Sequence, residues 1–133
     1  MMTIGCVVAS WIACGTVPMI IYWGLKLINP SVFLLTSCLI TAIIAIPIGS
    51  SWSAAGTIGV ALMGIGMGLG VNPAMTAGAV VSGAYLGDKM SPMSDTTNLA
   101  PAVAEADLFD HIKSMMYTTG PAFVVTLIVY GLL

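Results

Sequence analysis

Charged residues are confined to two short parts of this chain, and this restricts the kind of protein it can form. Only 6% of the 133 residues are charged and 59% are hydrophobic, and every charged residue except Lys26 lies between Asp88 and Lys113. The mean hydropathy is +1.07, well above that of soluble globular domains. The charge-free stretches are long enough for bilayer-spanning helices, which need about 20 residues. We therefore expect an all-α integral membrane protein.

Short polar stretches and Gly and Pro residues divide this single transmembrane domain into six expected segments. These cover residues 3–25, 32–49, 57–71, 73–87, 98–119 and 120–133. Small residues recur at three-to-four spacing in the third and fourth segments, as they do where membrane helices pack closely. The fifth segment becomes amphipathic after Asp107, which fits a helix lying partly at the membrane interface before the final span.

Composition also excludes several function classes. The formal net charge is −2 and no basic stripe is present, so we expect no nucleic-acid partner. The glycine-rich stretch GIGMGLG lacks the register and context of a nucleotide-binding loop, and no zinc-binding spacing such as HExxH occurs. We expect no cofactor and no resident metal.

The stretch Gly83–Pro101, GAYLGDKMSPMSDTTNLAP, is the main functional clue. Its ionisable and polar side chains are expensive in a membrane unless they have a function. Non-helical backbone at membrane depth persists only where it is buried in protein or lines a cavity. We therefore expect a broken helix, with a gap over Asp88–Asn98 between a helix ending near Gly87 and a half-helix starting near Asn98.

Oxygen-bearing side chains in such a gap suit a small hard cation. A carboxylate there can also couple cation binding to proton binding, because burial favours its protonated form and a bound cation favours its ionised form. Asp95 is the first candidate for this group and Asp88 the second. The other candidates for ion or proton binding are Ser94, Thr96, Thr97 and Asn98, with Ser91 as a secondary one.

Simpler roles remain open for both aspartates. Asp95 has the residue type that caps the N-terminus of a helix. Asp88 and Lys89 could instead form an ion pair near the lipid headgroups.

These residues carry a resemblance to a known family. Gly83–Tyr117, GAYLGDKMSPMSDTTNLAPAVAEADLFDHIKSMMY, resembles the signature region of the NhaC family of sodium/proton antiporters. The stretch from Gly49 to Tyr85, which begins GSSWSAAGTIGV, resembles the part of that family just upstream. The likeness covers at least residues 49–120 and is specific in GDKMSP and SDTTNLAP.

The resemblance implies Na⁺/H⁺ exchange across the cytoplasmic membrane by a multi-pass protein, with Na⁺, H⁺ and lipid as its partners and no enzymatic activity. It implies an ion-transporter-type inverted-repeat fold, of which only part is present. Val32–Val71 would be a helical hairpin with SSWSAAGT at its tip, facing the helix break. Secondary candidates for the ion path at this tip, which could equally be local hydrogen-bonding groups, are Ser50, Ser51 and Thr57.

Family members are several times longer, which leaves three alternatives open. The chain could be an inactive fragment, or it could need a further copy or the rest of a split antiporter. An intramembrane aspartyl hydrolase using Asp88 and Asp95 is a remote alternative. His111 is a candidate modulator of pH response, because histidine titrates near neutral pH, or a plain interfacial residue.

Overall fold

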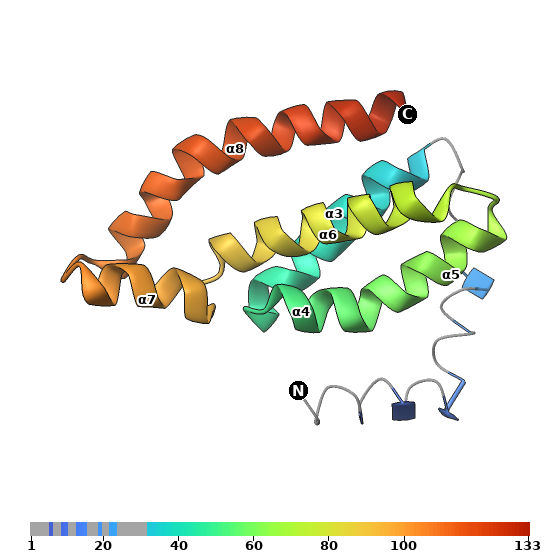
Figure 1. Cartoon of the computed structure of the whole chain (residues 1–133), viewed down its shortest axis with the longest axis horizontal. Coiled ribbons are helices and arrows are strands. Elements are labelled where there is room, and N and C mark those ends of the chain that lie inside the picture. The colour runs from blue at the N-terminus through green and yellow to red at the C-terminus, as the bar shows by residue number, and fades with distance from the viewer. Residues whose placement is uncertain (1–5, 7–8, 11–12, 16–18, 20–21, 24–31) are drawn as a thin grey trace.

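The computed structural model describes residues 6, 9–10, 13–15, 19, 22–23 and 32–133 (Figure 1). The segment predicted at 3–25 lies mostly outside these residues. Every regular element of the described residues is helical, with no strand among them, so the prediction of an all-α chain is confirmed for this part. One of these helices, at Leu108–Leu132, is long and apolar enough to cross a membrane, and Phe33–Ile48 is a shorter apolar helix.

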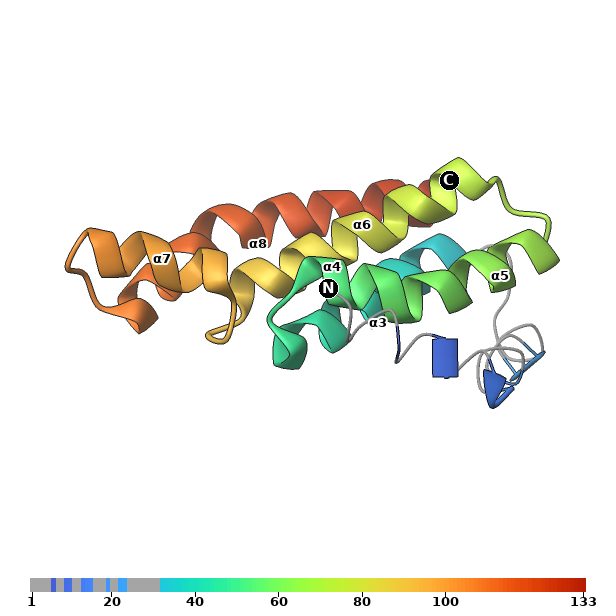
Figure 2. The same ribbon diagram turned by 60° about the horizontal axis from the view of Figure 1, so that its bottom comes forward.

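The helices follow one another back and forth along the long axis of the molecule (Figures 1 and 2). A first helix runs to one end, a second arm returns, and a third helix runs beside the first. A short helix then lies beyond the end of the third, and the last helix runs back along the whole length. In chain order the elements are α3 (Phe33–Ile48), α4 (Ser51–Ala54), the π-helical turn η2 (Ala55–Gly59), α5 (Val60–Gly68), α6 (Pro73–Met90), α7 (Asp95–Val103) and α8 (Leu108–Leu132).

The returning arm of the first hairpin begins earlier than expected. Helix α4 starts at Ser51 and continues through η2 into α5, whereas we predicted a polar tip through Thr57. The reversal needs only Gly49 and Ser50. Gly49 takes the left-handed conformation with φ of 65°, which favours glycine, and Ser50 caps α4 by accepting a hydrogen bond from Ser53 N at 3.4 Å.

Helices α3 and α6 cross at close range because α6 presents glycines to α3. A Cβ at Gly83 would overlap the carbonyl oxygen of Cys38, and one at Gly87 would overlap that of Ala42. The two glycines are four residues apart and therefore share one face of α6. Small residues at this spacing let membrane helices approach closely, which fixes the end of α6 against α3.

Larger side chains fill the space between the hairpin and α6 beyond this crossing. The buried cluster draws on α3, α5 and α6, and its members are Phe33, Leu34, Cys38, Leu62, Ile65, Ala79 and Val80. Helix α8 packs on the outside and has no fully buried residue. It is joined to α6 by a hydrogen bond between the hydroxyls of Ser82 and Tyr130, 3.2 Å apart.

The gap between α6 and α7 is much shorter than predicted. Helix α6 continues past Gly87 to Met90, and α7 begins at Asp95, so only Ser91–Ser94 separate the two helices. Asp88 is therefore helical, and Asn98 lies inside α7 rather than before it. Gly87 packs against α3 and Asp88 is buried at the pocket described below, so this last turn of α6 is held in the interior despite its polar sequence.

The structure also joins two segments that we expected to be separate. A single helix, α8, covers Leu108–Leu132 and passes through Pro121, where we predicted an interfacial helix followed by a short final span. Asp107 starts it by accepting hydrogen bonds from the backbone of Phe109 and Asp110, at 2.8 and 3.2 Å. Its 25 residues exceed the length that a membrane span requires.

Candidate functional site

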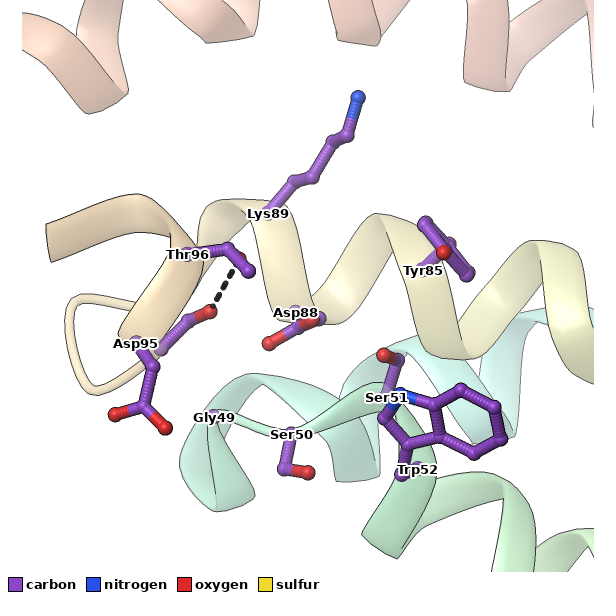
Figure 3. Close-up of a pocket in the computed structure, with 10 residues that line it drawn as sticks. Gly49, Ser50, Ser51, Trp52, Tyr85, Asp88, Lys89, Asp95 and Thr96 are labelled. Atoms are coloured by element: carbon purple, nitrogen blue, oxygen red, sulfur yellow. Dashed lines mark hydrogen bonds between the residues drawn. The ribbon is translucent and has the colours of Figure 1, made fainter. Parts of the chain in front are cut away.

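A pocket of about 320 Å³ lies where the hairpin turn meets the break between α6 and α7 (Figure 3). The hairpin contributes Gly49–Trp52, and the other side comes from the end of α6 and the start of α7. The two polar patches identified in the sequence therefore line one pocket. Its lining residues are Gly49, Ser50, Ser51, Trp52, Tyr85, Asp88, Lys89, Ser94, Asp95 and Thr96.

Asp88 is the buried carboxylate of this pocket. It lies in the last turn of α6 and is only 8% exposed. Its Oδ1 atom has no hydrogen-bond partner among the described residues. Leaving a buried polar atom unpaired costs about 1–3 kcal/mol, and more for a charged one. This atom is therefore available to a bound ion or proton.

Asp95 occupies a different environment. It is the first residue of α7 and is exposed, and Figure 3 shows its carboxylate pointing away from that of Asp88. The N-cap position belongs to Ser94, so Asp95 does not have the capping role considered above. A carboxylate in the first turn is nevertheless favoured by the helix dipole. Asp95 thus places negative charge beside the pocket without being enclosed in it.

The remaining oxygen candidates of this region divide into two groups. Ser94 and Thr96 line the pocket and share a hydrogen bond of 2.9 Å between their hydroxyls. Ser91, Thr97 and Asn98 are not among the lining residues; instead they hold the break together. Thr97 donates to the carbonyls of Lys89 at 3.2 Å and Asp88 at 3.4 Å.

Asn98 and Ser91 complete this structural role. The Asn98 amide nitrogen donates to the carbonyls of Pro92 and Ser94, both at 2.8 Å. The Ser91 hydroxyl accepts a hydrogen bond from Met93 N at 3.1 Å. These three side chains add hydrogen bonds to backbone groups at the end of α6 and within the break.

The hairpin candidates divide in the same way. Ser50 and Ser51 line the pocket, and Ser51 is buried. Thr57 lies within η2 outside the pocket lining, and its hydroxyl donates to Ser53 O at 2.7 Å. A π-helical turn this close to the pocket is notable, because such turns are frequent at functional sites.

Three residues near the pocket were not expected from the sequence. Gly49, Trp52 and Tyr85 line it because the turn at Gly49 and the long α6 bring them there. No sequence motif identified them. Only their position next to polar residues could have suggested them.

Lys89 and His111 are not among the residues proposed to bind the ion. Figure 3 shows the Lys89 side chain extending away from Asp88 toward α8. The two side chains therefore do not form the ion pair that their adjacency suggested. Lys89 is in the last turn of α6, where the helix dipole favours a cation. His111 is half-buried on α8, away from the pocket lining.

Known proteins that are similar to this chain are named as antiporters. The Na⁺/H⁺ antiporter family model matches residues 83–133. An uncharacterized Na⁺/H⁺ antiporter of Haemophilus influenzae is 52% identical over 98% of this chain and 28% of its own length. The Na⁺/H⁺ antiporter NhaC of Alkalihalophilus pseudofirmus is 52% identical over 96% of this chain and 28% of its own length.

A malate-2H⁺/Na⁺-lactate antiporter of Bacillus subtilis is 44% identical over 98% of this chain. It too is matched over 28% of its length, so this chain spans about a quarter to a third of such relatives. No solved structure is significantly similar to the chain. The relatives are named as transporters rather than enzymes. Nearly the whole chain aligns with these antiporters. The chain belongs to the Na⁺/H⁺ antiporter family and is a membrane protein of the NhaC type.

Proposed function

We propose that this chain forms the cation-binding part of an antiporter that exchanges Na⁺ for H⁺, with Asp88 as the carboxylate that binds both ions in turn. One observation carries the choice of Asp88. Its carboxylate is buried and has an unpaired oxygen at a pocket rich in hydroxyl groups. A carboxylate oxygen is a suitable ligand for a hard cation and is equally a proton acceptor. Because the two ions compete for the same group, release of one accompanies binding of the other.

The surrounding helix ends support cation binding at this position. The carbonyl end of α6 points toward the break, and the negative end of a helix dipole favours a cation. Pocket hydroxyls, including those of Ser51 and Thr96, offer further oxygen ligands. Discontinuous helices that flank a polar site are a common way for secondary transporters to hold a coupling ion.

Asp95 has a secondary role in this proposal. Its exposed carboxylate at the pocket would attract Na⁺ from solution rather than exchange it for a proton. This reverses the order of the two aspartates that we inferred from the sequence. Burial and the unpaired oxygen are the reasons for the reversal.

The complete ion pathway requires more than this segment. The chain spans 28% of the length of the two Na⁺/H⁺ antiporters compared above. We propose a multi-pass assembly in the cytoplasmic membrane, in which a further segment or a second copy supplies the other half of an inverted repeat. Without that half, the chain is expected to bind Na⁺ but not to carry it across the membrane.

Binding of radioactive Na⁺ to the purified chain tests the site itself. We expect saturable binding that weakens as the pH is lowered. Asp88→Asn should abolish it, and Asp95→Asn should weaken it. Asp110→Asn is the matched control, because this carboxylate is exposed in the first turn of α8. Wild-type Na⁺ affinity in folded Asp88→Asn would overturn the assignment.

Transport needs a separate measurement. Proton movement on addition of NaCl would be followed in everted membrane vesicles containing the chain, with Asp88→Asn as the comparison. A response in the wild type that is lost in the variant would show that copies of this chain complete the pathway. Na⁺ binding without any response would identify the chain as a partner-dependent segment.

A further inference from the structure

The candidate Na⁺ pocket lies at one end of the packed helices α3, α5 and α6. The turn between α3 and α4 and the break between α6 and α7 form the pocket, and α7 and the start of α8 lie beyond them in the same direction (Figures 1 and 2). The turn between α5 and α6, at Val71–Asn72, lies at the opposite end, beside the start of α3 (Figure 1). We call these two ends the α7 end and the Asn72 end.

The charged residues mark the α7 end as a membrane surface. Every charged side chain of the described residues belongs to Asp88–Lys113, and neither 32–87 nor 114–133 contains one. Charged side chains are costly in hydrocarbon, so the polar start of α8 lies at the surface. From Ser114 to Leu132, α8 is about 28 Å long at about 1.5 Å per residue. This length matches the roughly 30 Å of hydrocarbon in a bilayer.

Helix α8 also gives the depth of the pocket. It runs antiparallel to α6 (Figure 1), and the hydroxyls of Ser82 and Tyr130, 3.2 Å apart, join the two helices. Side chains of α6 as far as Lys89 share one hollow with those of α8 from Thr119 onward. The last turn of α6 therefore lies beside Thr119, about 8 Å from the start of the charge-free part of α8 by the helical rise. Asp88 belongs to this turn and is thus close to the surface at the α7 end.

The apolar core separates the pocket from the Asn72 end. The buried cluster of α3, α5 and α6 lies on that side of the pocket, and its members are at most 5% exposed. Between α3 and α6 the backbones are in contact, because a Cβ at Gly83 would overlap the carbonyl oxygen of Cys38. A cation that entered this core would lose its water without gaining ligands, which is very costly. The described residues therefore close the pocket toward the Asn72 end.

We propose that ions reach the Asp88 pocket from the membrane surface at the α7 end alone. The apolar core keeps the pocket closed to the surface at the Asn72 end. The identity of the ion as Na⁺ rests on the function proposed above. The accessibility of the pocket does not depend on Na⁺ binding, so it can be measured separately and each proposal can fail without the other.

Thiol labelling in sealed membrane vesicles tests this access. Ser50→Cys places a thiol in the pocket, Ala104→Cys marks the α7 end and Ala74→Cys marks the Asn72 end, since both alanines are exposed. Two variants combine Ser50→Cys with one marker or the other, after the exposed Cys6 and Cys14 are replaced by serine. The probe is a membrane-impermeant methanethiosulfonate that carries a trimethylammonium group. The intact mass then gives the number of labels on each molecule.

Counting labels on each molecule makes the result independent of the direction in which the chain inserts. With the Ala104→Cys marker we expect two labels or none, and with the Ala74→Cys marker we expect one. The reverse pattern would overturn the proposal, because the pocket would then open at the Asn72 end. Two labels with either marker would overturn it as well, and so would a Ser50→Cys thiol that is never labelled. A variant with both markers and no Ser50→Cys must carry one label, which establishes that the vesicles are sealed.

Cys38 serves as the folding control. It is fully buried in the core and should stay unlabelled as long as the chain is folded. If Cys38 is labelled in the Ser50→Cys variants, Thr96→Cys on the other wall of the pocket replaces Ser50→Cys as the reporter, with the same expected counts. In detergent, where both ends meet water, the pocket thiol and both markers should all react. A pocket thiol that stays unreactive in the folded chain in detergent would also contradict the proposal.

Discussion

Gly49 lies directly against the main chain of Met93. A Cβ atom at Gly49 would fall 2.7 Å from the Met93 carbonyl carbon and 2.9 Å from its oxygen. The turn between α3 and α4 therefore touches the break between α6 and α7. Because both turns line the candidate Na⁺ site, their contact sets the distance across it.

Gly49→Ala tests this contact. The added methyl group must displace the Met93 backbone, and the φ of 65° at position 49 disfavours a side chain in any case. We expect a loss of stability of about 1–3 kcal/mol, together with weaker Na⁺ binding. Thermal unfolding in detergent and radioactive Na⁺ binding measure the two effects. Gly120→Ala is the control, because a Cβ atom added there on α8 would meet nothing within 4 Å.

The crossing of α3 and α6 gives a second prediction. Gly87→Ala places a methyl group against Ala42 O and the Ala45 side chain, so the two helices must separate. We expect destabilisation of about 1–3 kcal/mol and movement of the neighbouring Asp88. Gly56→Ala, where nothing lies within 4 Å, provides the comparison. Equal melting temperatures for the two variants would contradict the close crossing.

These glycines illustrate what the sequence could predict of the fold. Spacing of small residues indicated that α6 packs closely, and composition indicated helices. The end of α6 was placed at Gly87, because glycine and the polar residues after it resemble a helix stop. The packing of Gly87 on α3 extends the helix to Met90 instead. Such a contact between distant segments is not visible in local sequence.

The candidate site shows the same division. The polar stretches were recognisable because charge and hydroxyl groups are rare in this chain. The relative burial of Asp88 and Asp95 was not, since it depends on which face of α6 meets α3 and on where α7 begins. Pro121 is a similar case, because a proline that suggested a new segment lies within one continuous helix, α8.

Thr97 is predicted to stabilise the helix break rather than bind Na⁺. Its buried hydroxyl donates to the carbonyls of Asp88 and Lys89 across the break. Thr97→Val removes this donor while Asp88 O keeps its hydrogen bond from Ser91 N, so we expect a loss of about 0.5–1.5 kcal/mol in unfolding free energy. Thr97→Ser retains the hydroxyl and should recover most of it. An equally destabilised Thr97→Ser would mean that the methyl group, not the hydrogen bond, is important.

His111→Ala is predicted to leave Na⁺ binding intact at high pH. The imidazole lies on α8 outside both the pocket lining and its hydrogen-bonded support. At most, the pH dependence of Na⁺ binding should shift. The measurement is a Na⁺ titration at several pH values. Complete loss of binding would show that His111 contributes directly to the site.

Thr96 and Thr97 are adjacent threonines with opposite expected roles, which makes them a matched pair. Thr96 is exposed at the pocket, and within the described residues its hydroxyl bonds to Ser94 alone, so Thr96→Val should leave the melting temperature nearly unchanged. Because the Thr96 hydroxyl is then lost as an oxygen ligand, Na⁺ binding should weaken by about fivefold to tenfold, which is the usual contribution of one such interaction. Thr97→Val should show the reverse pattern, with lower stability and a smaller change in affinity. If Thr96→Val binds Na⁺ like the wild type, its hydroxyl is not a ligand, and the serines of the hairpin turn become the remaining neutral oxygen candidates.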